Sequence, residues 1–320
     1  MRILLTTTSY QDTPGKHHEV LAASGFEVVR ARGPLTEAQM LELVKGEGFD
    51  GFLNGDDLIT AQVIDAALPR LKVMAKYGIG LDSIDVKYAT SKKIPVLFTP
   101  GVNHTTVAEH TFLLMIALAK HFWPHIKSTK SGGWKRMTGN ELFGKKVAVL
   151  GVGRIGKEVI KRARAFDMEC VGFDKFWDDA FAAQYGVERA ATIAEAVQDA
   201  DVISLHMNLD ESNRGFVNAE FISKLKKGAY IVNTARGGLV NENDIAAACK
   251  SGQLGGYGTD VVAQEPMTQP HAYDGIDNII VTPHVGSRTF ESVERQAMRA
   301  TRNIVEFLQG GKDYIQANQF

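Results

Sequence analysis

The sequence predicts an α/β protein with two doubly wound parallel sheets, one in each of two domains. Short apolar runs alternate with helix-like segments along most of the chain, which favours parallel sheets covered by helices. In mid-chain one such run leads into a glycine-rich turn, G-V-G-R-I-G. The length of 320 residues exceeds what a single hydrophobic core usually organises.

Composition and charge narrow the classes of function. Hydrophobic residues make up 44% of the chain and charged residues 23%, as in ordinary globular proteins. The net charge of -1 provides no basic surface for nucleic acid or an acidic membrane, so neither partner is expected. The longest apolar run, residues 111–119, is too short to span a bilayer. With no signal-peptide pattern and two cysteines in core-like segments, a cytoplasmic location is predicted.

The first hundred residues read as five alternating strand and helix units, which predicts one parallel sheet. Strands are expected at residues 2–6, 26–30, 50–53, 71–75 and 96–98. Helices are expected at 16–24, 60–68 and 84–92, and another opens at Thr36, where Gln39 completes a capping box. These elements form a complete small domain before the glycine turn.

The rest of the chain repeats the alternation. A long apolar helix is expected over about residues 105–120, and its apolar surface all round predicts burial. Later strands are expected near 201–205, 230–233, 256–260 and 278–282, with a helix at 242–250. The last helix, residues 289–308, must pack against another element, because one face carries Val293, Ala297, Ala300, Ile304 and Leu308.

Residues 144–174 read as strand, glycine turn, helix and second strand, ending on an acid. Gly151 permits the tight turn, Gly153 lets the backbone approach a pyrophosphate, and Gly156 lets the helix pack on the strand. The N-terminus of that helix attracts phosphate groups. Asp174, at the end of the second strand, would accept hydrogen bonds from ribose hydroxyls. This combination predicts a dinucleotide-binding site.

Asp174 also favours NAD over NADP. The 2′-phosphate of NADP would face this carboxylate, and two unit charges about 4 Å apart repel by about 4 kcal/mol at an effective dielectric constant of about 20. The adjacent Lys175 would offset part of the repulsion. NAD is therefore the predicted cofactor, and NADP is the less favoured alternative.

An ionisable residue follows each of three later apolar runs: Arg236, Glu265 and His284. The carboxyl ends of parallel strands line the crevice where ligands bind, so these residues are expected to converge there. Arg236 could hold a carboxylate or carbonyl oxygen with its planar fork. His284 can exchange a proton near neutral pH, and Glu265 would favour its imidazolium and fix its orientation. Taken singly, each residue is better explained by a structural role: a surface arginine, a helix-start glutamate or a capping histidine.

Several motifs together resemble the D-isomer-specific 2-hydroxyacid dehydrogenase family, most closely its phosphoglycerate dehydrogenase branch. They are KYGIGLDSIDV, NHTTVAEHT, GVGRIG, NTARGGLVNENDI, DVVAQEP and TPHVGS, from about residue 71 to 290. The resemblance implies a flavodoxin-like substrate domain (residues 1–99 and 288–320) and a Rossmann NAD-binding domain (100–287). It also implies an active site in the cleft between them and a homodimer built largely on the NAD-binding domains.

The resemblance also assigns roles to residues. It implies hydride transfer between NAD(H) and C2 of a small D-2-hydroxy or 2-keto acid, with Arg236, Glu265 and His284 as the catalytic set. Asp260 would contact the nicotinamide amide, and the amides of Gly78 and Ile79 would receive the substrate carboxylate. The predicted cofactor-binding residues are Gly151, Gly153, Arg154, Ile155, Gly156, Asp174, His206, Thr234, Ala235 and Asp260. The predicted substrate-binding residues are Asn54, Lys76, Tyr77, Gly78, Ile79 and Arg236.

Two departures from the family pattern bear on the substrate and the cofactor pocket. Where phosphoglycerate dehydrogenases have a phosphate-holding arginine, this chain has Gly55, Asp56 and Asp57, whose carboxylates would repel a phosphate. Lys76 remains a candidate cation. Asn208 replaces a proline that many members carry after the histidine at 206, which would alter the adenine side of the pocket.

The alternatives are a glyoxylate/hydroxypyruvate reductase, a phosphoglycerate dehydrogenase and, in the same fold, a phosphite or formate dehydrogenase. An NAD(H)-sensing corepressor-like binding protein is an alternative of another class. His121 and His125 are four residues apart, but Pro124 lies between them and no third ligand is evident, so no metal site is predicted.

Overall fold

The computed structural model describes residues 1–46 and 48–320, and the chain divides into two compact units. Unit 1 comprises Met1–Asn103 and Arg288–Phe320, and unit 2 comprises His104–Ser287. Unit 2 begins with helix α6 (His104–Ala119). Each unit is built on its own parallel sheet, which confirms the predicted fold class.

Unit 1 contains a five-stranded parallel sheet in the order β2-β1-β3-β4-β5. Its strands are β1 (Arg2–Leu5), β2 (Glu27–Arg30), β3 (Gly51–Asn54), β4 (Val73–Lys76) and β5 (Val96–Leu97). Its helices are α1 (Thr8–Asp12), α2 (Lys16–Ala23), α3 (Glu37–Val44), α4 (Ala61–Ala67), α5 (Val86–Ser91) and α13 (Phe290–Gln309). The sequence analysis did not predict α1. The predicted capping box of Thr36 and Gln39 is present at the start of α3.

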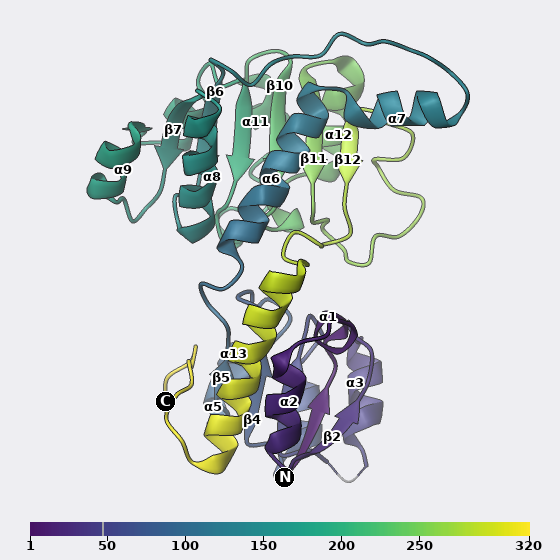
Figure 1. The fold of residues 1–320 in the computed structure, drawn as a ribbon, viewed down its shortest axis with the longest axis vertical. Helices are drawn as coiled ribbons and strands as arrows, with labels where there is room; N and C mark the ends of the chain where they lie inside the picture. The colour runs from purple at the N-terminus through teal and green to yellow at the C-terminus, as the bar shows by residue number, and fades with distance from the viewer. Residues whose placement is uncertain (47) are drawn as a thin grey trace. The chain divides into compact units, whose positions relative to one another are not determined.

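Helices cover both faces of this sheet because alternate strand residues point to opposite sides. Ile3 and Leu5 of β1 pack with α2 and α13, whereas Leu4 between them packs with α3, α4 and α5. Figure 1 shows α13 running alongside α2 and β4 within this unit. The predicted apolar stripe of α13, from Val293 to Leu308, is buried, which confirms its docking role.

Unit 2 contains a seven-stranded parallel sheet in the order β12-β11-β10-β9-β6-β7-β8. Its strands are β6 (Lys146–Leu150), β7 (Glu169–Phe173), β8 (Val187–Arg189), β9 (Val202–Leu205), β10 (Ala229–Asn233), β11 (Leu254–Thr259) and β12 (Ile279–Val281). Strand order reverses at β6, which pairs with β7 on one side and β9 on the other. Ligands bind outside the carboxyl ends of the strands at such a switch point.

The helices of unit 2 also form two layers. α6 and α8 (Arg154–Ala165) cover one face, and α10 (Ile193–Val197), α11 (Ala219–Ser223) and α12 (Glu242–Ser251) cover the other. A short 3-10 helix, η1 (Gly237–Leu239), and α7 (Phe122–Lys130) and α9 (Asp179–Tyr185) complete the unit. Most of α6 is buried as expected, but Leu113 is 53% exposed.

His121 and His125 do not lie on one helix face. Pro124 lies in the first turn of α7, where a proline costs no hydrogen bond. His121 precedes the helix with a left-handed backbone (φ 48°), and His125 Nε2 accepts the Met137 amide at 3.0 Å. Throughout residues 1–46 and 48–320, none of the helices has the length and apolar character that crossing a membrane requires.

Candidate active site

The glycine turn is fixed by close packing on two sides. Gly151 has φ +99°, and a Cβ there would lie 2.6 Å from the backbone carbon of His206. A Cβ on Gly156 would overlap the carbonyl oxygen of Gly151. Gly153, in contrast, has open space around its Cβ position. The first and third glycines therefore serve packing, and the second leaves room for a ligand at the N-terminus of α8, where Arg154 and Ile155 form the first turn.

Asp174 closes this turn from the end of β7. Its Oδ2 accepts the Val152 amide at 2.7 Å, and its Oδ1 accepts the Phe176 amide at 2.7 Å. A carboxylate has about four lone-pair directions, so acceptor capacity remains on both oxygens. The remaining acceptor capacity suits hydroxyl donors such as those of a ribose, and the turn, the helix start and this acid fit a bound dinucleotide.

His206 follows β9 beside the glycine turn. Burial lowers the pKa of His206 to about 3, so the imidazole is neutral, although the residue keeps some exposed surface. Its Nε2 lies 2.7 Å from Ser204 Oγ, and its buried Nδ1 has no hydrogen-bond partner within the described residues.

Arg236 lies just beyond β10 in a loop that Asn233 holds. The side chain of Asn233 is fully buried, accepts the Ala235 amide at 3.0 Å and donates to the Arg236 carbonyl at 2.9 Å. Thr234 lies in the same loop, with its hydroxyl 2.8 Å from Thr111 Oγ1. Arg236 Nη1 donates to the Ala235 carbonyl at 2.7 Å. These hydrogen bonds hold the loop at the point where the guanidinium leaves it.

The structure brings Glu265 and His284 into direct contact. His284 Nδ1 lies 2.7 Å from Glu265 Oε2, with 41% and 35% of the two side chains exposed. Glu265 is held in turn by the Val262 amide, which donates to Oε1 at 3.2 Å. Both residues lie in loops beyond the ends of β11 and β12 rather than at the last strand residue, since the strands end at Thr259 and Val281. Arg236 lies beyond β10, the neighbouring strand.

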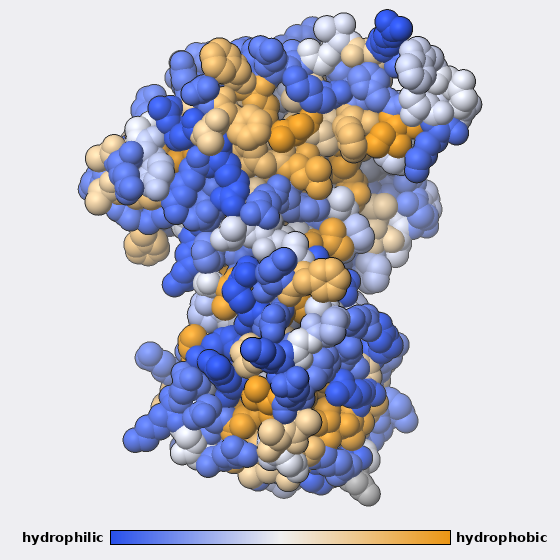
Figure 2. Space-filling view, viewed as in Figure 1, coloured by the Kyte–Doolittle hydropathy of each residue, from blue (hydrophilic) through white to orange (hydrophobic). Residues whose placement is uncertain are grey.

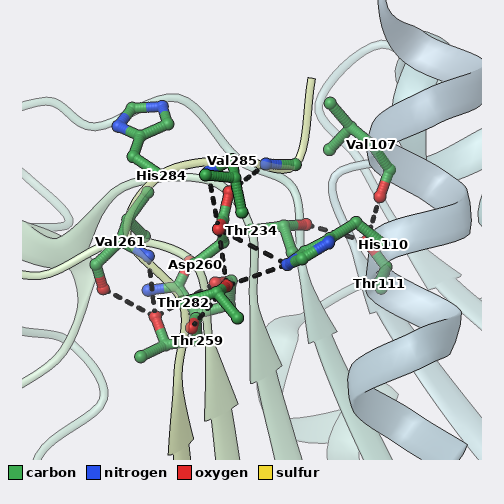
Figure 3. Close-up of polar contacts among 12 residues, drawn as sticks. Val107, His110, Thr111, Thr234, Thr259, Asp260, Val261, Thr282, His284 and Val285 are labelled. Carbon is green, nitrogen blue, oxygen red and sulfur yellow. Dashed lines mark hydrogen bonds and ion pairs between the residues drawn. The ribbon is translucent and has the colours of Figure 1, made fainter. Parts of the chain in front are cut away.

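Asp260 is buried at the centre of a polar network next to His284 (Figure 3). Its Oδ1 accepts the Thr282 hydroxyl at 2.6 Å and the Val285 amide at 2.9 Å, and its Oδ2 accepts the Gly286 amide at 2.7 Å. Burial by itself would raise the pKa of Asp260, but hydrogen bonds from His110, Thr282 and the two amides outweigh it and lower the pKa. The carboxylate is therefore charged, and only part of its acceptor capacity remains for a nicotinamide amide.

The sequence analysis missed His110 and Thr282. His110 Nε2, from α6, lies 2.8 Å from Thr282 Oγ1 and 3.4 Å from Asp260 Oδ1. Both residues stand inside motifs that carried the family resemblance, AEHT and TPH, but no local pattern indicated their contact.

In unit 1, the candidate substrate residues lie at the carboxyl ends of β3 and β4. Lys76 is 2% exposed, and its Nζ donates to the Gly55 carbonyl and to Asp56 Oδ1, both at 2.6 Å. Asn54 is fully buried and donates to the Gly55 carbonyl at 3.2 Å, while its Oδ1 has no hydrogen-bond partner within residues 1–46 and 48–320.

Asp57 does not have the position that the sequence suggested. It is fully buried and accepts the Thr6 hydroxyl, the Leu35 amide at 2.8 Å and the Gly55 amide at 2.9 Å. Its charge stabilises the loop after β3 and is not presented to a ligand. The exposed carboxylate is that of Asp56, which pairs with Lys76.

The next loop holds the other three candidates. The Gly78 amide donates to Thr99 Oγ1 at 2.9 Å, so this predicted carboxylate donor is already engaged within unit 1. The Tyr77 amide donates to the Asn54 carbonyl at 2.8 Å, which ties the loop to β3. Burial raises the pKa of Tyr77 to about 12, so its phenol is neutral. Substrate binding by Tyr77, Gly78 and Ile79 stays a prediction.

Comparisons with known proteins agree with this geometry. The family model "D-isomer specific 2-hydroxyacid dehydrogenase, NAD binding domain" matches residues 112–286. The chain is 37% identical to a D-3-phosphoglycerate dehydrogenase of Methanocaldococcus jannaschii over 97% of its own length and 58% of that protein's. It is 39% identical to a hydroxypyruvate reductase of Thermotoga maritima, over 78% of this chain and 81% of that one.

Among solved structures, the TT0316 protein of Thermus thermophilus superimposes with a TM-score of 0.89 at 33% identity. The match covers 99% of this chain and 100% of that one. The chain thus spans somewhat more than half of the Methanocaldococcus relative and the whole of the Thermus one. It belongs to the D-isomer-specific 2-hydroxyacid dehydrogenases, a family of NAD-dependent oxidoreductases, and residues 112–286 carry that family's NAD-binding domain.

Proposed function

We propose that this protein interconverts a small D-2-hydroxy acid and the corresponding 2-keto acid with NAD(H). The observation that carries the proposal is the 2.7 Å contact between His284 Nδ1 and Glu265 Oε2, in the same unit as a complete dinucleotide turn. Glu265 engages Nδ1, and Nε2 is the nitrogen proposed to exchange the proton with the substrate.

His284 is the proposed acid and base. In reduction it donates a proton to the carbonyl oxygen of the keto acid, and in oxidation it removes the proton of the hydroxyl. Glu265 stabilises the imidazolium form and fixes the ring orientation. Arg236 is proposed to hold a carboxylate or carbonyl oxygen of the substrate, because its planar fork can donate two parallel hydrogen bonds.

The residues proposed to hold the cofactor are those of the glycine turn, Asp174, His206, the loop of Thr234 and Ala235, and Asp260. When bound, NAD(H) would exchange a hydride with C2 of the substrate. Asp174 Oδ1 and Oδ2 retain acceptor capacity for ribose hydroxyls, which favours NAD, and their charge opposes a 2′-phosphate.

The Lys76–Asp56 pair bears on the choice of substrate. A phosphate group approaching Lys76 would compete with Asp56, which already lies 2.6 Å from the ammonium and is 68% exposed. A neutral substituent such as hydroxyl meets no such competition. We therefore place glyoxylate or hydroxypyruvate reduction ahead of phosphoglycerate oxidation.

A substrate panel tests the proposal directly. The full chain is assayed with NADH and with NADPH against hydroxypyruvate, glyoxylate, pyruvate, phosphohydroxypyruvate, branched 2-keto acids and sugar-derived 2-keto acids. The expected result is NADH oxidation with a non-phosphorylated short keto acid. Turnover with phosphohydroxypyruvate alone would contradict the substrate assignment. Absence of turnover with every acid would contradict the enzymatic proposal and favour the NAD(H)-sensing binding protein.

We also propose that the protein forms a homodimer through unit 2. Large apolar side chains are exposed on and around α6 and α7, and apolar residues gather on this face in Figure 2. These exposed side chains are Leu113 on α6, Phe122 and Trp123 on α7, and Phe166, whose ring contacts Phe112 of α6. Light scattering coupled to size-exclusion chromatography should give twice the 35.0 kDa chain mass, and a monomer would contradict the proposal. A cytoplasmic location stays a prediction.

A further inference from the structure

The backbone at His284 requires support from its surroundings. His284 has φ +51°, a left-handed conformation that residues with a side chain rarely adopt. Its amide donates to the Asp260 carbonyl at 2.9 Å, and the next two amides, of Val285 and Gly286, donate to the two oxygens of the Asp260 carboxylate. Asp260 therefore binds three consecutive amides that begin at His284.

The fit at Gly286 is close. A Cβ at this position would lie 2.8 Å from Asp260 Oδ2 and 3.6 Å from His110 Cδ2. The loop can approach the carboxylate this closely only with glycine at 286. As Figure 3 shows, the His284 ring points away from the network, so the network holds the backbone and leaves the imidazole outside.

Two further side chains determine where the Asp260 carboxylate lies. The Thr282 hydroxyl donates to Asp260 Oδ1 at 2.6 Å, and the only other acceptor recorded for it, the Thr259 carbonyl, lies 3.4 Å away. Its single hydrogen is therefore used on the shorter bond to the carboxylate. The contact of 2.8 Å between Thr282 Oγ1 and His110 Nε2 then requires that His110 donates, which assigns the hydrogen of His110 to Nε2. The same nitrogen lies 3.4 Å from Asp260 Oδ1. His110 on α6 thus contacts the Thr282 hydroxyl, and that hydroxyl orients the Asp260 carboxylate that binds the loop of His284.

We propose that His110 and Thr282 are positioning residues for His284. They hold the Asp260 carboxylate where it binds the Val285 and Gly286 amides, and the bound amides fix the left-handed backbone from which the imidazole projects. This inference rests on the proposed acid/base role of His284. In this inference His110 and Thr282 do not take part in the proton transfer and do not contact Glu265, but they determine the position of the His284 imidazole.

Substitutions in pairs test the proposal. At position 282, Thr282→Val removes the hydroxyl and Thr282→Ser keeps it. At position 110, His110→Leu removes the hydrogen-bond donor, whereas His110→Gln places an amide donor near the position of Nε2. With the best acid of the panel, Thr282→Val and His110→Leu should lower kcat about ten- to a hundred-fold, because small displacements of a catalytic group are costly. Their Kd for NADH, from protein fluorescence, should change much less than kcat, because the glycine turn and Asp174, on other loops, are proposed to hold the rest of the cofactor. Thr282→Ser and His110→Gln should recover most of kcat.

A matched control separates positioning from loss of stability. Thr301 is a fully buried threonine of unit 1 whose hydroxyl lies 2.7 Å from the Tyr10 hydroxyl. Thr301→Val should lower Tm but leave kcat unchanged. If Thr282→Val and His110→Leu also lower only Tm and keep kcat, the proposal is overturned. If Thr282→Val does not fold, the two His110 variants decide: the proposal stands if kcat falls in His110→Leu and recovers in His110→Gln, and it is overturned if His110→Leu keeps kcat.

Amide hydrogen exchange gives a readout that needs no turnover. The amides of Val285 and Gly286 should exchange faster in Thr282→Val and in His110→Leu than in the unsubstituted protein, and Thr301→Val should leave them unchanged. Unchanged exchange in the first two variants would overturn the proposal. If the unsubstituted protein turns over none of the acids, the proposed function fails, and faster exchange still supports the positioning of the loop.

Discussion

His284 combines a left-handed backbone, a carboxylate partner and a side chain that points away from the buried network. Each feature has a separate cause: the Asp260 bonds hold the backbone, Glu265 orients the ring, and the loop after β12 carries the residue past the sheet edge. These three features are what the proposed acid/base role requires. Arg236, on a loop that Asn233 holds, is the residue proposed to bind the substrate.

Replacing His284 with glutamine should remove turnover and keep cofactor binding. Glutamine has a similar size but cannot exchange a proton near neutral pH, so kcat should fall by about a hundred-fold or more. The Kd for NADH should change little, because the cofactor turn lies on other loops. His18→Gln in unit 1, where His18 Nε2 bonds to the Thr13 carbonyl, is the matched control and should keep full turnover. Near-normal turnover of His284→Gln would reject the acid/base assignment.

Replacing Arg236 with lysine should weaken substrate binding. Lysine keeps the charge but loses the planar fork, so KM for the keto acid should rise about ten-fold while KM for NADH stays similar. Steady-state kinetics measure both constants, and Arg302→Lys on the exposed side of α13 is the control. Unchanged constants in Arg236→Lys would argue against two parallel hydrogen bonds.

At the scale of elements, the unit formed by β6, the glycine turn, α8 and β7 illustrates how local patterns specify structure. Its strands and helix lie where the apolar runs and glycines indicated. The α8 face that packs on the sheet carries Val159, Ile160 and Ala163, and its basic residues bond outside the core, as with Lys157 to Asp178 at 2.5 Å. Short elements without a strong pattern, such as α1 and β8, were not predicted.

Two glycine substitutions in this turn should have different consequences. Gly156→Ala places a methyl group against the Gly151 carbonyl oxygen, so the free energy of unfolding should fall by about 3 kcal/mol. Gly153→Ala meets no neighbouring atom and should keep its stability, but it should bind NADH more weakly because the methyl group faces the ligand side. Denaturant unfolding and NADH titration measure the two effects. Equal stability of the two variants would contradict this account.

At the scale of the whole molecule, the first and last segments of the chain share one core. α13 returns to unit 1 and packs on β1, β3 and β4, so this core is complete only when the C-terminal segment is in place. Asp50, just before β3, ties several segments of that unit together: it accepts the Arg2 amide at 2.7 Å and pairs with Lys72 at 3.0 Å.

Asp50 should make the stability of the protein sensitive to acid. Burial would raise its pKa, but the Arg2 amide, Lys72 and Arg70 outweigh this and lower the pKa from 3.8 to about 2. Because the folded-state pKa lies below the unfolded one, the stabilisation is complete above about pH 4 and is lost as the pH falls through about 2. Asp50→Asn should therefore cost about 2 kcal/mol at pH 7 and reduce the loss of stability below pH 4.

Denaturant unfolding of the full chain at pH 7 and at pH 3 measures this difference, with the exposed Glu211→Gln as the control. An Asp50→Asn variant that matches the unsubstituted protein at pH 7 would show that the ion pairs contribute nothing to stability.

The sequence by itself determined the two parallel sheets, the glycine turn with Asp174, and the residues Arg236, Glu265 and His284 as candidates. These features depend on periodicity and turn chemistry within short segments, which the sequence displays directly. The tertiary structure alone decided that Asp57 is an internal acceptor and that the Gly78 amide is engaged by Thr99. It also joined His110 on α6 to Thr282, 172 residues away. Such contacts arise when distant segments pack together, and no local pattern encodes them.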